Sequence, residues 1–223
     1  MRTLFFAVDY RIFTLILSPQ SVYITIQREI MNFSEKCFRI FEQATRAYHV
    51  IDSVDAPARN PYPVNSIEFY LYMKNWIDGV QWHLESLIRR KEVTPEEIAR
   101  LWQRIKKLNT DREDMIELID SIIAEMYRST KVREDAPLNT ETPGWALDRL
   151  STLCLRIYHI RRALLKAEDT KQQESLLKME AQLVMQKDDL ATALDQLLAD
   201  IRNGKKRLKL YKQIKIYDAV AYE

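Results

Sequence analysis

Glycine is scarce in this chain, and its scarcity limits the folds that the chain can adopt. The 223 residues include only 3 Gly, whereas Gly makes up about 7% of an average protein. The tight hairpins of β-sheets commonly need Gly because their turns require positive φ angles. A sheet-rich fold is therefore hard to build, and a composition of 47% hydrophobic and 30% charged residues excludes a disordered or fibrous chain.

Apolar residues recur at intervals of three and four along five segments, which is typical of amphipathic helices. A strong start signal is Thr94-Pro95-Glu96-Glu97, where a capping Thr precedes Pro at the first helical position. Asn203-Gly204 gives a stop signal. The expected helices run from residue 32 to before 55, from 65 to about 91, from 94 to about 130, from 142 past 164, and from 170 to about 202.

Short or proline-bearing loops join these segments, which favours antiparallel packing of consecutive helices. The sequence therefore predicts an all-α fold, an antiparallel bundle of about five helices with one long central helix over residues 94–130. Residues 205–223 are expected to form an extended C-terminal tail. Because no internal repeat or second domain boundary is found, residues 31–223 are expected to form a single helical domain. Trp76, Trp102 and Trp145 lie at core spacings and are expected in its interior.

Residues 1–30 are rich in apolar side chains but are interrupted by Asp9 and Arg11. No run approaches the ~18 apolar residues that a membrane span needs, and no unbroken apolar core of a signal peptide is present. Met31 supplies a second start, because Asn32 and Glu35 have the spacing of a helix capping box. We expect residues 1–30 to be a non-native or poorly packed extension from an upstream start codon. The alternative is a segment that docks on the bundle.

Charge and cysteine content limit the partners and the compartment. The 34 basic and 32 acidic residues are interleaved and give a net charge of +2, so nucleic acid is not expected as a partner. Cys37 and Cys154 are far apart on apolar helix faces, which favours a reduced, cytoplasmic setting. The basic residues over 205–215 could contact phosphates, but a solvated helix end is the simpler interpretation. Self-association into a homo-oligomer is left as an alternative.

One arginine interrupts the apolar seam of the long third helix. A guanidinium in a bundle seam loses several kcal/mol of hydration unless carboxylates surround it, so neighbouring helices must supply partners for Arg112. The second, third and fourth helices all carry polar residues at suitable spacing. The candidate polar cluster comprises Asn75, Asp78, Trp82, His83, Glu85, Arg89, Asn109, Arg112, Glu117, Asp120, Asp148, Arg149 and His159.

Two functions of different classes fit this cluster. In the first, it is a closed ion-pair network that fixes helix register, and the protein is an interaction or accessory protein with an unknown protein partner. In the second, it is an open pocket of an enzyme that hydrolyses or transfers a phosphate-containing ligand, a nucleotide or a sugar phosphate. We favour the first, because no nucleophile can be assigned, and catalytic residues stay unknown.

The spacing of acidic residues, histidines and cysteines along the chain does not define a set of metal ligands. Glu113, Glu117 and Asp120 stand at i, i+4 and i+7, and with Glu85 they could hold Mg²⁺ through oxygen ligands. The signal is weak, since such pairs are common in charged helices. The histidines at 49, 83 and 159 show no zinc spacing, and neither cysteine has a partner two or four residues away. No cofactor is expected, with Mg²⁺ as the alternative.

The polar blocks also resemble a bacterial family of uncharacterised helical proteins, the domain of unknown function 4254. The similarity covers roughly residues 66–161, although Ser86 and Glu113 stand where Asp and Asn are expected. It is carried by Trp82-His83-Leu84-Glu85 with Arg89, by Asn109-Thr110-Asp111-Arg112 with Asp114, Glu117 and Asp120, and by Thr142-Pro143-Gly144 with Asp148-Arg149-Leu150-Ser151 and Ile157-Tyr158-His159. The resemblance implies that these blocks form one site and that the protein serves envelope-polysaccharide pathways.

Overall fold

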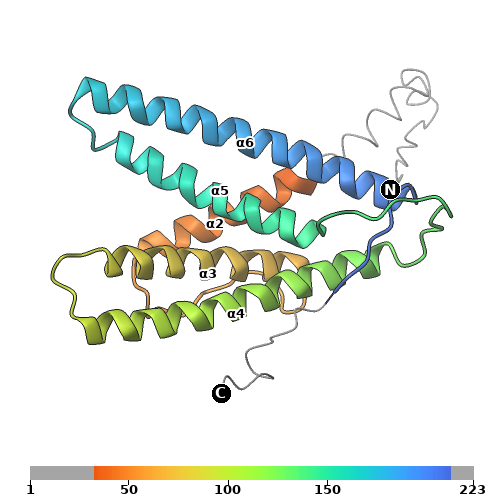
Figure 1. The fold of residues 1–223 in the computed structure, drawn as a ribbon, viewed down its shortest axis with the longest axis horizontal. Helices are drawn as coiled ribbons and strands as arrows, with labels where there is room; N and C mark the ends of the chain where they lie inside the picture. The colour runs from red at the N-terminus through yellow and green to blue at the C-terminus, as the bar shows by residue number, and fades with distance from the viewer. Residues whose placement is uncertain (1–32, 212–223) are drawn as a thin grey trace, which may run out of the picture.

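The computed structural model describes residues 33–211, and five α-helices make up most of this part of the chain (Figure 1). Their bounds are Phe33–Ile51 for α2, Ile67–Ile88 for α3, Pro95–Met126 for α4, Pro143–Leu164 for α5 and Thr170–Arg202 for α6. The predicted all-α fold class is confirmed. The prediction for residues 1–30 and the one for the end of the tail lie outside the described residues. None of the described helices has the length and apolar character to cross a membrane.

Side-chain caps explain where the helices begin. Thr94 and Glu97 form the predicted capping box at the start of α4. The side chain of Thr142 accepts a hydrogen bond from the backbone N–H of Trp145, and Asp169 caps α6 in the same way. Ser66, and not Asn65, caps α3. At their C-terminal ends, α3 and α4 stop three to four residues earlier than expected.

The helices form two hairpins, α3 with α4 and α5 with α6, and α2 packs on both of them (Figure 1). Helix α3 contacts α2, α4 and α5, so α3 and α5 occupy the middle of the bundle. The hydrophobic core lies where these helices meet. Its fully buried members include Phe41, Tyr48, Leu71, Leu84, Ile119, Leu147, Leu150 and Leu198.

The long helix α4 packs on α3 and α5 at the side of the bundle and not at its centre. Its buried residues are Ile105, Ile116, Ile119, Asp120 and Ile123. The apolar seam therefore continues from Arg112 to residues 116, 119 and 123, and Met126 is 56% exposed. Trp102 is 54% exposed, so its expected place in the core is wrong. It lies on the solvent side of a helix that has only one packed face.

The first half of α6 and the tail that follows α6 lie outside the core. In the first half of α6, Leu177, Met179 and Met185 are exposed, while Leu194, Leu198 and Ile201 of the second half are buried. After α6, the tail runs in extended form beside the loop that precedes α5, where Leu138 and Arg207 form an isolated parallel bridge. The turn between α6 and the tail requires Gly204, since its φ is +66° and a Cβ would lie 2.2 Å from the carbonyl oxygen of Lys131.

Candidate functional site

Arg112 lies at the crossing of α3, α4 and α5, where it contacts carboxylates of two other helices. Its Nε lies 2.6 Å from Oδ1 of Asp148 and its Nη2 lies 2.5 Å from Oδ2. This is the two-pronged geometry that a guanidinium makes with a carboxylate. Asp78 of α3 lies 3.7 Å from Nε. Two of the polar residues that the sequence placed together therefore surround the arginine of the seam.

A buried lysine that the sequence analysis missed joins the same contacts. Lys74 is 1% exposed, and its Nζ contacts the carboxylate of Asp78 and lies 2.7 Å from Oδ1 of Asp148. Lys74, Asp78, Arg112 and Asp148, which we call the ionic network, combine two cations with two anions. Because the four charges cancel, their burial is tolerated. Lys74 lies one helical turn before Asp78, which is the only local signal that could have identified it.

Neutral side chains extend the ionic network toward α2. Ser151 donates a hydrogen bond of 2.6 Å to Asp78 and accepts one of 2.9 Å from Asn75. The side-chain oxygen of Asn75 accepts a hydrogen bond of 2.8 Å from Thr45. Every member of this chain has a partner, which is the condition for a buried polar network to stabilise a fold.

The two carboxylates of the ionic network differ in their pKa shifts. Burial alone raises the pKa of Asp148, but the charges and hydrogen bonds of Lys74 and Arg112 outweigh burial and hold it below its ordinary value. Burial dominates at Asp78 and raises its pKa, although Lys74 and Ser151 act in the opposite direction. The two cations therefore favour the charged form of Asp148.

One edge of the ionic network, made by Arg112 and Asp148, reaches a cavity. Arg112 and Asp148 line a space of about 640 Å³ against α6, together with Arg149 and Arg156. Lys74, Asn75 and Asp78 are buried behind this edge and do not line it. The geometry is that of a closed structural network with one accessible side.

Other residues of the predicted cluster lie elsewhere. Asp120 accepts hydrogen bonds from the hydroxyl of Thr142 and from the backbone N–H of Gly144 at 2.7 Å, so it holds the start of α5. Arg149 pairs with Glu141 at the surface, since on a helix it points about 100° away from Asp148. Asn109 and Glu117 are half-buried on α4.

Glu85 and Arg89, which were expected in the polar cluster, lie apart from the ionic network. Half-buried Glu85 and exposed Arg89 form a pair one turn apart near the end of α3, with 3.6 Å between Nη2 and Oε2. Glu85 also accepts a hydrogen bond from Gln81 at 3.0 Å. The stripe that begins at Asn75 and Asp78 rotates away from α5 along α3, so its last residues reach the surface.

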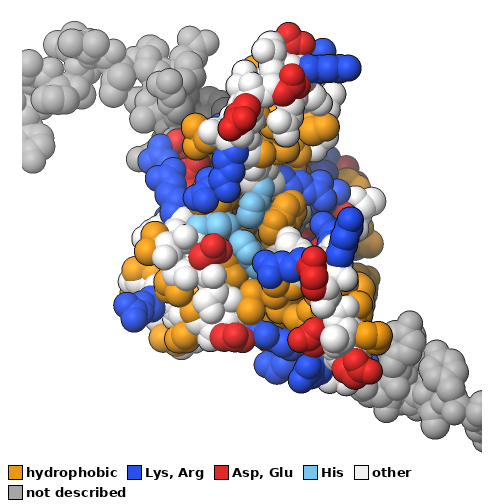
Figure 2. Space-filling model, turned by 90° about the vertical axis from the view of Figure 1, so that its left-hand side faces the viewer, with side chains coloured by type: hydrophobic (Ala, Val, Ile, Leu, Met, Phe, Trp, Pro, Cys, Tyr) orange, Lys and Arg blue, Asp and Glu red, His pale blue; other side chains and the backbone are white. Residues whose placement is uncertain are grey.

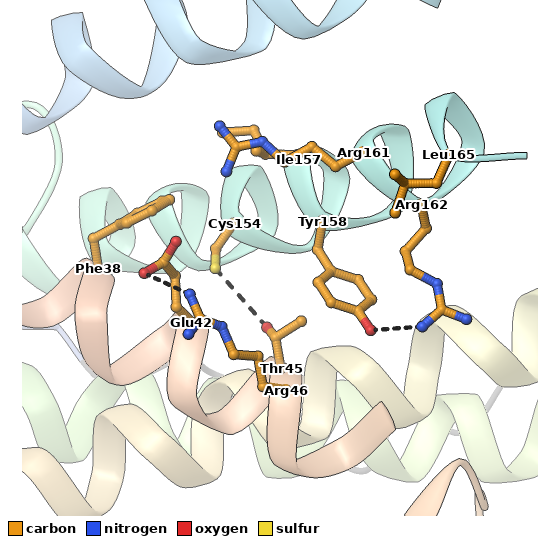
Figure 3. A pocket seen from close by; sticks show the side chains of 10 residues that line it. All are labelled: Phe38, Glu42, Thr45, Arg46, Cys154, Ile157, Tyr158, Arg161, Arg162 and Leu165. Carbon is orange, nitrogen blue, oxygen red and sulfur yellow. Dashed lines mark hydrogen bonds and ion pairs between the residues drawn. The ribbon is translucent and has the colours of Figure 1, made fainter. Parts of the chain in front are cut away.

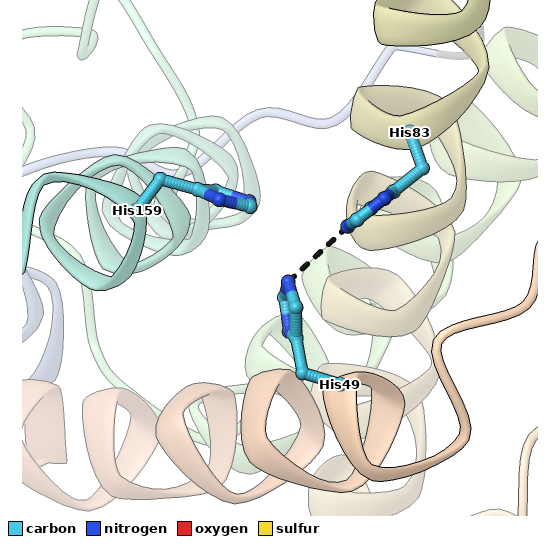
Figure 4. A group of neighbouring side chains, drawn as sticks. All are labelled: His49, His83 and His159. Atoms are coloured by element: carbon cyan, nitrogen blue, oxygen red, sulfur yellow. Dashed lines mark hydrogen bonds between the residues drawn. The ribbon is translucent and has the colours of Figure 1, made fainter. Parts of the chain in front are cut away.

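Three histidines from three helices form a second group of functional side chains (Figure 4). His49 of α2, His83 of α3 and His159 of α5 each offer a ring nitrogen, and these nitrogens lie within 4.8 Å of one another. We call these residues the histidine cluster. The Nε2 atoms of His49 and His83 are 3.2 Å apart. Figure 2 shows histidine side chains together at one end of the molecule, with Lys and Arg side chains on either side.

The surroundings of the histidine cluster orient its rings. Nδ1 of His49 donates a hydrogen bond of 2.7 Å to the carbonyl oxygen of Thr45, so Nε2 of the neutral ring carries a free lone pair. Nδ1 of His83 lies 3.8 Å from Oδ1 of Asp52. Trp82 stacks on His159 with 4.6 Å between ring centroids and 9° between planes. Such contacts with carbonyl and carboxylate groups are typical of metal-ligating histidines.

His159 is incompletely satisfied, because its Nε2 is buried and has no hydrogen-bond partner among the described residues. Burial, followed by the neighbouring charges of His49, His83 and Arg162, lowers its pKa to about 4. Burial also lowers the pKa of His49 and of His83. All three rings are therefore neutral near pH 7, the form that binds metal ions.

The histidine cluster brings three potential metal ligands together, which no group of carboxylates among the described residues does. Two nitrogens bound at 2.0–2.1 Å to a tetrahedral ion are about 3.3 Å apart, close to the 3.2 Å between His49 and His83. Over residues 33–211, no cluster that includes Glu85, Glu113, Glu117 or Asp120 offers three ligand atoms at such distances. These histidines show no zinc spacing along the chain because only the packing of three helices brings them together.

A small cavity between α2 and α5 lies beside the histidine cluster (Figure 3). It measures about 250 Å³, and its lining includes Thr45, Cys154, Tyr158 and Arg162. The ring of Tyr158 packs on His49 with 4.2 Å between centroids, and its hydroxyl accepts a hydrogen bond of 3.3 Å from Arg162. Burial raises the pKa of the Cys154 thiol to about 12, so this cysteine is not a nucleophile at neutral pH.

The family model described as "Protein of unknown function (DUF4254)" matches residues 68–210 of the chain. The matched region contains the ionic network and two of the three histidines, and only His49 of α2 precedes it. Comparisons with curated proteins and with solved structures give no match.

Proposed function

The chain belongs to the family of unknown function DUF4254, and we propose that it is a metal-binding protein whose histidine cluster holds one divalent transition-metal ion of the zinc class. The observation that carries the proposal is the convergence of His49, His83 and His159 within 4.8 Å. Imidazole nitrogens suit Zn²⁺ and its neighbours in the transition series.

The number of ligands defines the kind of centre. Structural zinc sites use four protein ligands, whereas catalytic sites use three and leave one position for water or substrate. With three histidines, the centre is of the open type, and a bound ion would supply a Lewis acid and an activated water. This supports the hydrolytic alternative of the sequence analysis and moves its site from the ionic network to the histidine cluster.

The contacts of His83 suit a ligand role. The lone pair of His49 Nε2 accepts a hydrogen bond from His83 Nε2, because the other nitrogen of His49 already donates to Thr45. If His83 held a metal ion through Nε2, the neutral ring would carry its hydrogen on Nδ1, which faces Asp52 at 3.8 Å. The carboxylate is thus placed to stabilise the bound form.

Metal analysis of the full-length protein, purified without a polyhistidine tag, tests the proposal. After dialysis against Zn²⁺, the wild type is expected to retain one equivalent per chain. His83→Gln and His159→Gln each remove one of three ligands and should weaken binding by about a hundredfold or more. Glu85→Gln, half a turn from His83 on α3, is the matched control and should bind like wild type. Wild-type protein that retains no ion, or a His83→Gln variant that binds equally, would overturn the proposal.

A second candidate function is protein docking, which the first half of α6 favours. Leu177 and Met185, eight residues apart and so on nearly the same side of α6, are 54% and 58% exposed, and exposed apolar side chains on one helix face are common at interfaces. If this surface joins two copies of the chain, light scattering should show a dimer that Leu177→Glu dissociates. A wild-type monomer at high concentration would contradict self-association. A cytoplasmic setting stays a prediction from the two cysteines, and a role in envelope-polysaccharide pathways stays a prediction from the family resemblance.

A further inference from the structure

Two arginines of α5 lie on either side of the metal ligand His159. Arg156 precedes it by three residues and Arg162 follows it by three, so each is about one helical turn away. Arg156 lines a cavity of about 370 Å³ together with Trp82 and His159. Arg162 donates to the hydroxyl of Tyr158, the ring that packs on His49. Arg156 thus shares a cavity with His159, and Arg162 contacts the ring that packs on His49.

Neither arginine is neutralised by an acidic side chain in the part of the chain that the structure describes. Other arginines nearby are paired. Arg161, the neighbour of Arg162, lies 2.6 Å from Glu180, and Arg46 lies 3.5 Å from Glu42. Arg156 and Arg162 are exposed and keep the planar set of N–H donors that binds carboxylates and phosphates.

The charge around a bound ion requires an anion. A divalent ion held by three neutral imidazoles keeps its full charge, and the two guanidinium groups add to it. Asp52 is the carboxylate that approaches a ring of the cluster, at 3.8 Å from His83, and it offsets only a small part of this charge. Positive charges held together in this way favour a ligand of opposite sign at the open coordination position.

We propose that Arg156, Arg162 and a metal ion in the histidine cluster together bind a doubly charged oxyanion, the phosphate group of a phosphate monoester. The inference rests on the proposed function, since the metal ion supplies one of the three contacts. A tetrahedral phosphate offers enough oxygens for one metal ion and two guanidinium groups, whereas a carboxylate has only two oxygens. Trp82, Ile160 and Leu183 line the cavity beside Arg156 and provide an apolar wall for the organic part of the ester.

Calorimetry with the full-length, zinc-loaded protein tests the inference, with inorganic phosphate as the probe and acetate as the comparison anion. Wild type should bind phosphate more tightly than acetate, and the metal-free protein should bind phosphate at least about tenfold more weakly. Arg156→Gln and Arg162→Gln each remove one charge-assisted contact, and each should weaken phosphate binding by about tenfold or more. Arg161→Gln, whose arginine is already paired with Glu180, is the matched control and should bind phosphate like wild type.

The same variants separate this inference from the proposed function. Zinc retention of Arg156→Gln and Arg162→Gln should equal or exceed that of wild type, because a positive charge near the ion has been removed. If wild type retains zinc but both variants bind phosphate unchanged, the oxyanion site is wrong and the metal site stands. Acetate binding as tight as phosphate binding would overturn the phosphate class. If wild type retains no zinc, both proposals fail.

Discussion

Arg112 of α4 donates two hydrogen bonds to Asp148 of α5, and Asp148 at the same time contacts the buried Nζ of Lys74 from α3. One carboxylate thus joins cations from two other helices. Because removal of either cation leaves Asp148 less neutralised in a buried position, the energetic consequences of this relationship can be measured by substitution.

Arg112→Ala should lower the free energy of unfolding by about 3 kcal/mol, since it breaks a two-pronged pair with a carboxylate that is only 3% exposed. The value stays at the lower end for buried pairs because the side chain of Arg112 is 29% exposed. Urea denaturation monitored by circular dichroism measures the change. Arg149→Ala, which removes an exposed pair with Glu141, is the control and should cost less than about 1 kcal/mol.

Lys74→Met should also destabilise the protein, because it leaves Asp78 and Asp148 with only Arg112 between them. Adding Asp78→Asn to this variant restores the balance of charges in the ionic network, so the double variant should be more stable than the sum of the two single changes predicts. A double-mutant cycle from denaturation data gives this coupling, expected at about 1–3 kcal/mol. Strictly additive effects would show that the two side chains do not interact.

The stability that Asp148 contributes should depend on pH in a defined direction. Its pKa in the folded protein lies below the ordinary value of 3.8, so folding releases a proton from this group. The contribution is fully present above the unfolded pKa and is lost as the pH falls through the folded pKa. The difference in unfolding free energy between wild type and Asp148→Asn should therefore be largest above about pH 4 and should shrink at lower pH. A difference that grows on acidification would contradict the assignment.

Gly144→Ala should destabilise the start of α5. A Cβ at this position would lie 2.7 Å from the carboxyl group of Asp120, which holds the backbone N–H of Gly144 and the hydroxyl of Thr142. We expect a loss of about 1–3 kcal/mol in thermal or urea denaturation. Gly79→Ala within α3 is the comparison, because the new Cβ would lie 3.4 Å from the ring of Tyr48 on α2. That change should be neutral or slightly stabilising.

The helices could be predicted because their signals are local. The capping box at Thr94, the Thr-Pro start of α5 and the Gly stop after α6 all act within four residues of the sequence. Periodicity also identified Arg112 as a cation in the apolar seam that needs carboxylates. It could not identify which ones, since the direction of a side chain after several helical turns depends on how the helices rotate when they pack.

Lys74 and the histidine cluster show what local signals cannot reveal. Lys74 lies between residues of ordinary helical character, and only the approach of α5 buries it. His49, His83 and His159 are distant in sequence and come from three helices, so their spacing along the chain carries no information about a ligand set. The family resemblance did place His83 and His159 in one group, but it omitted His49, which lies outside the similar region.

The ionic network and the histidine cluster share two helices, and this links the stability of the bundle to the geometry of the metal site. Lys74, Asp78 and His83 lie on α3, while Asp148, Ser151 and His159 lie on α5. The contacts that Lys74 and Asp78 make with α5 fix the position of α3 along the axis of α5. A slip of a single helical turn, about 5.4 Å, would exceed the 4.8 Å within which the three ring nitrogens meet. Substitutions in the ionic network that leave the protein folded should therefore alter its metal affinity from a distance.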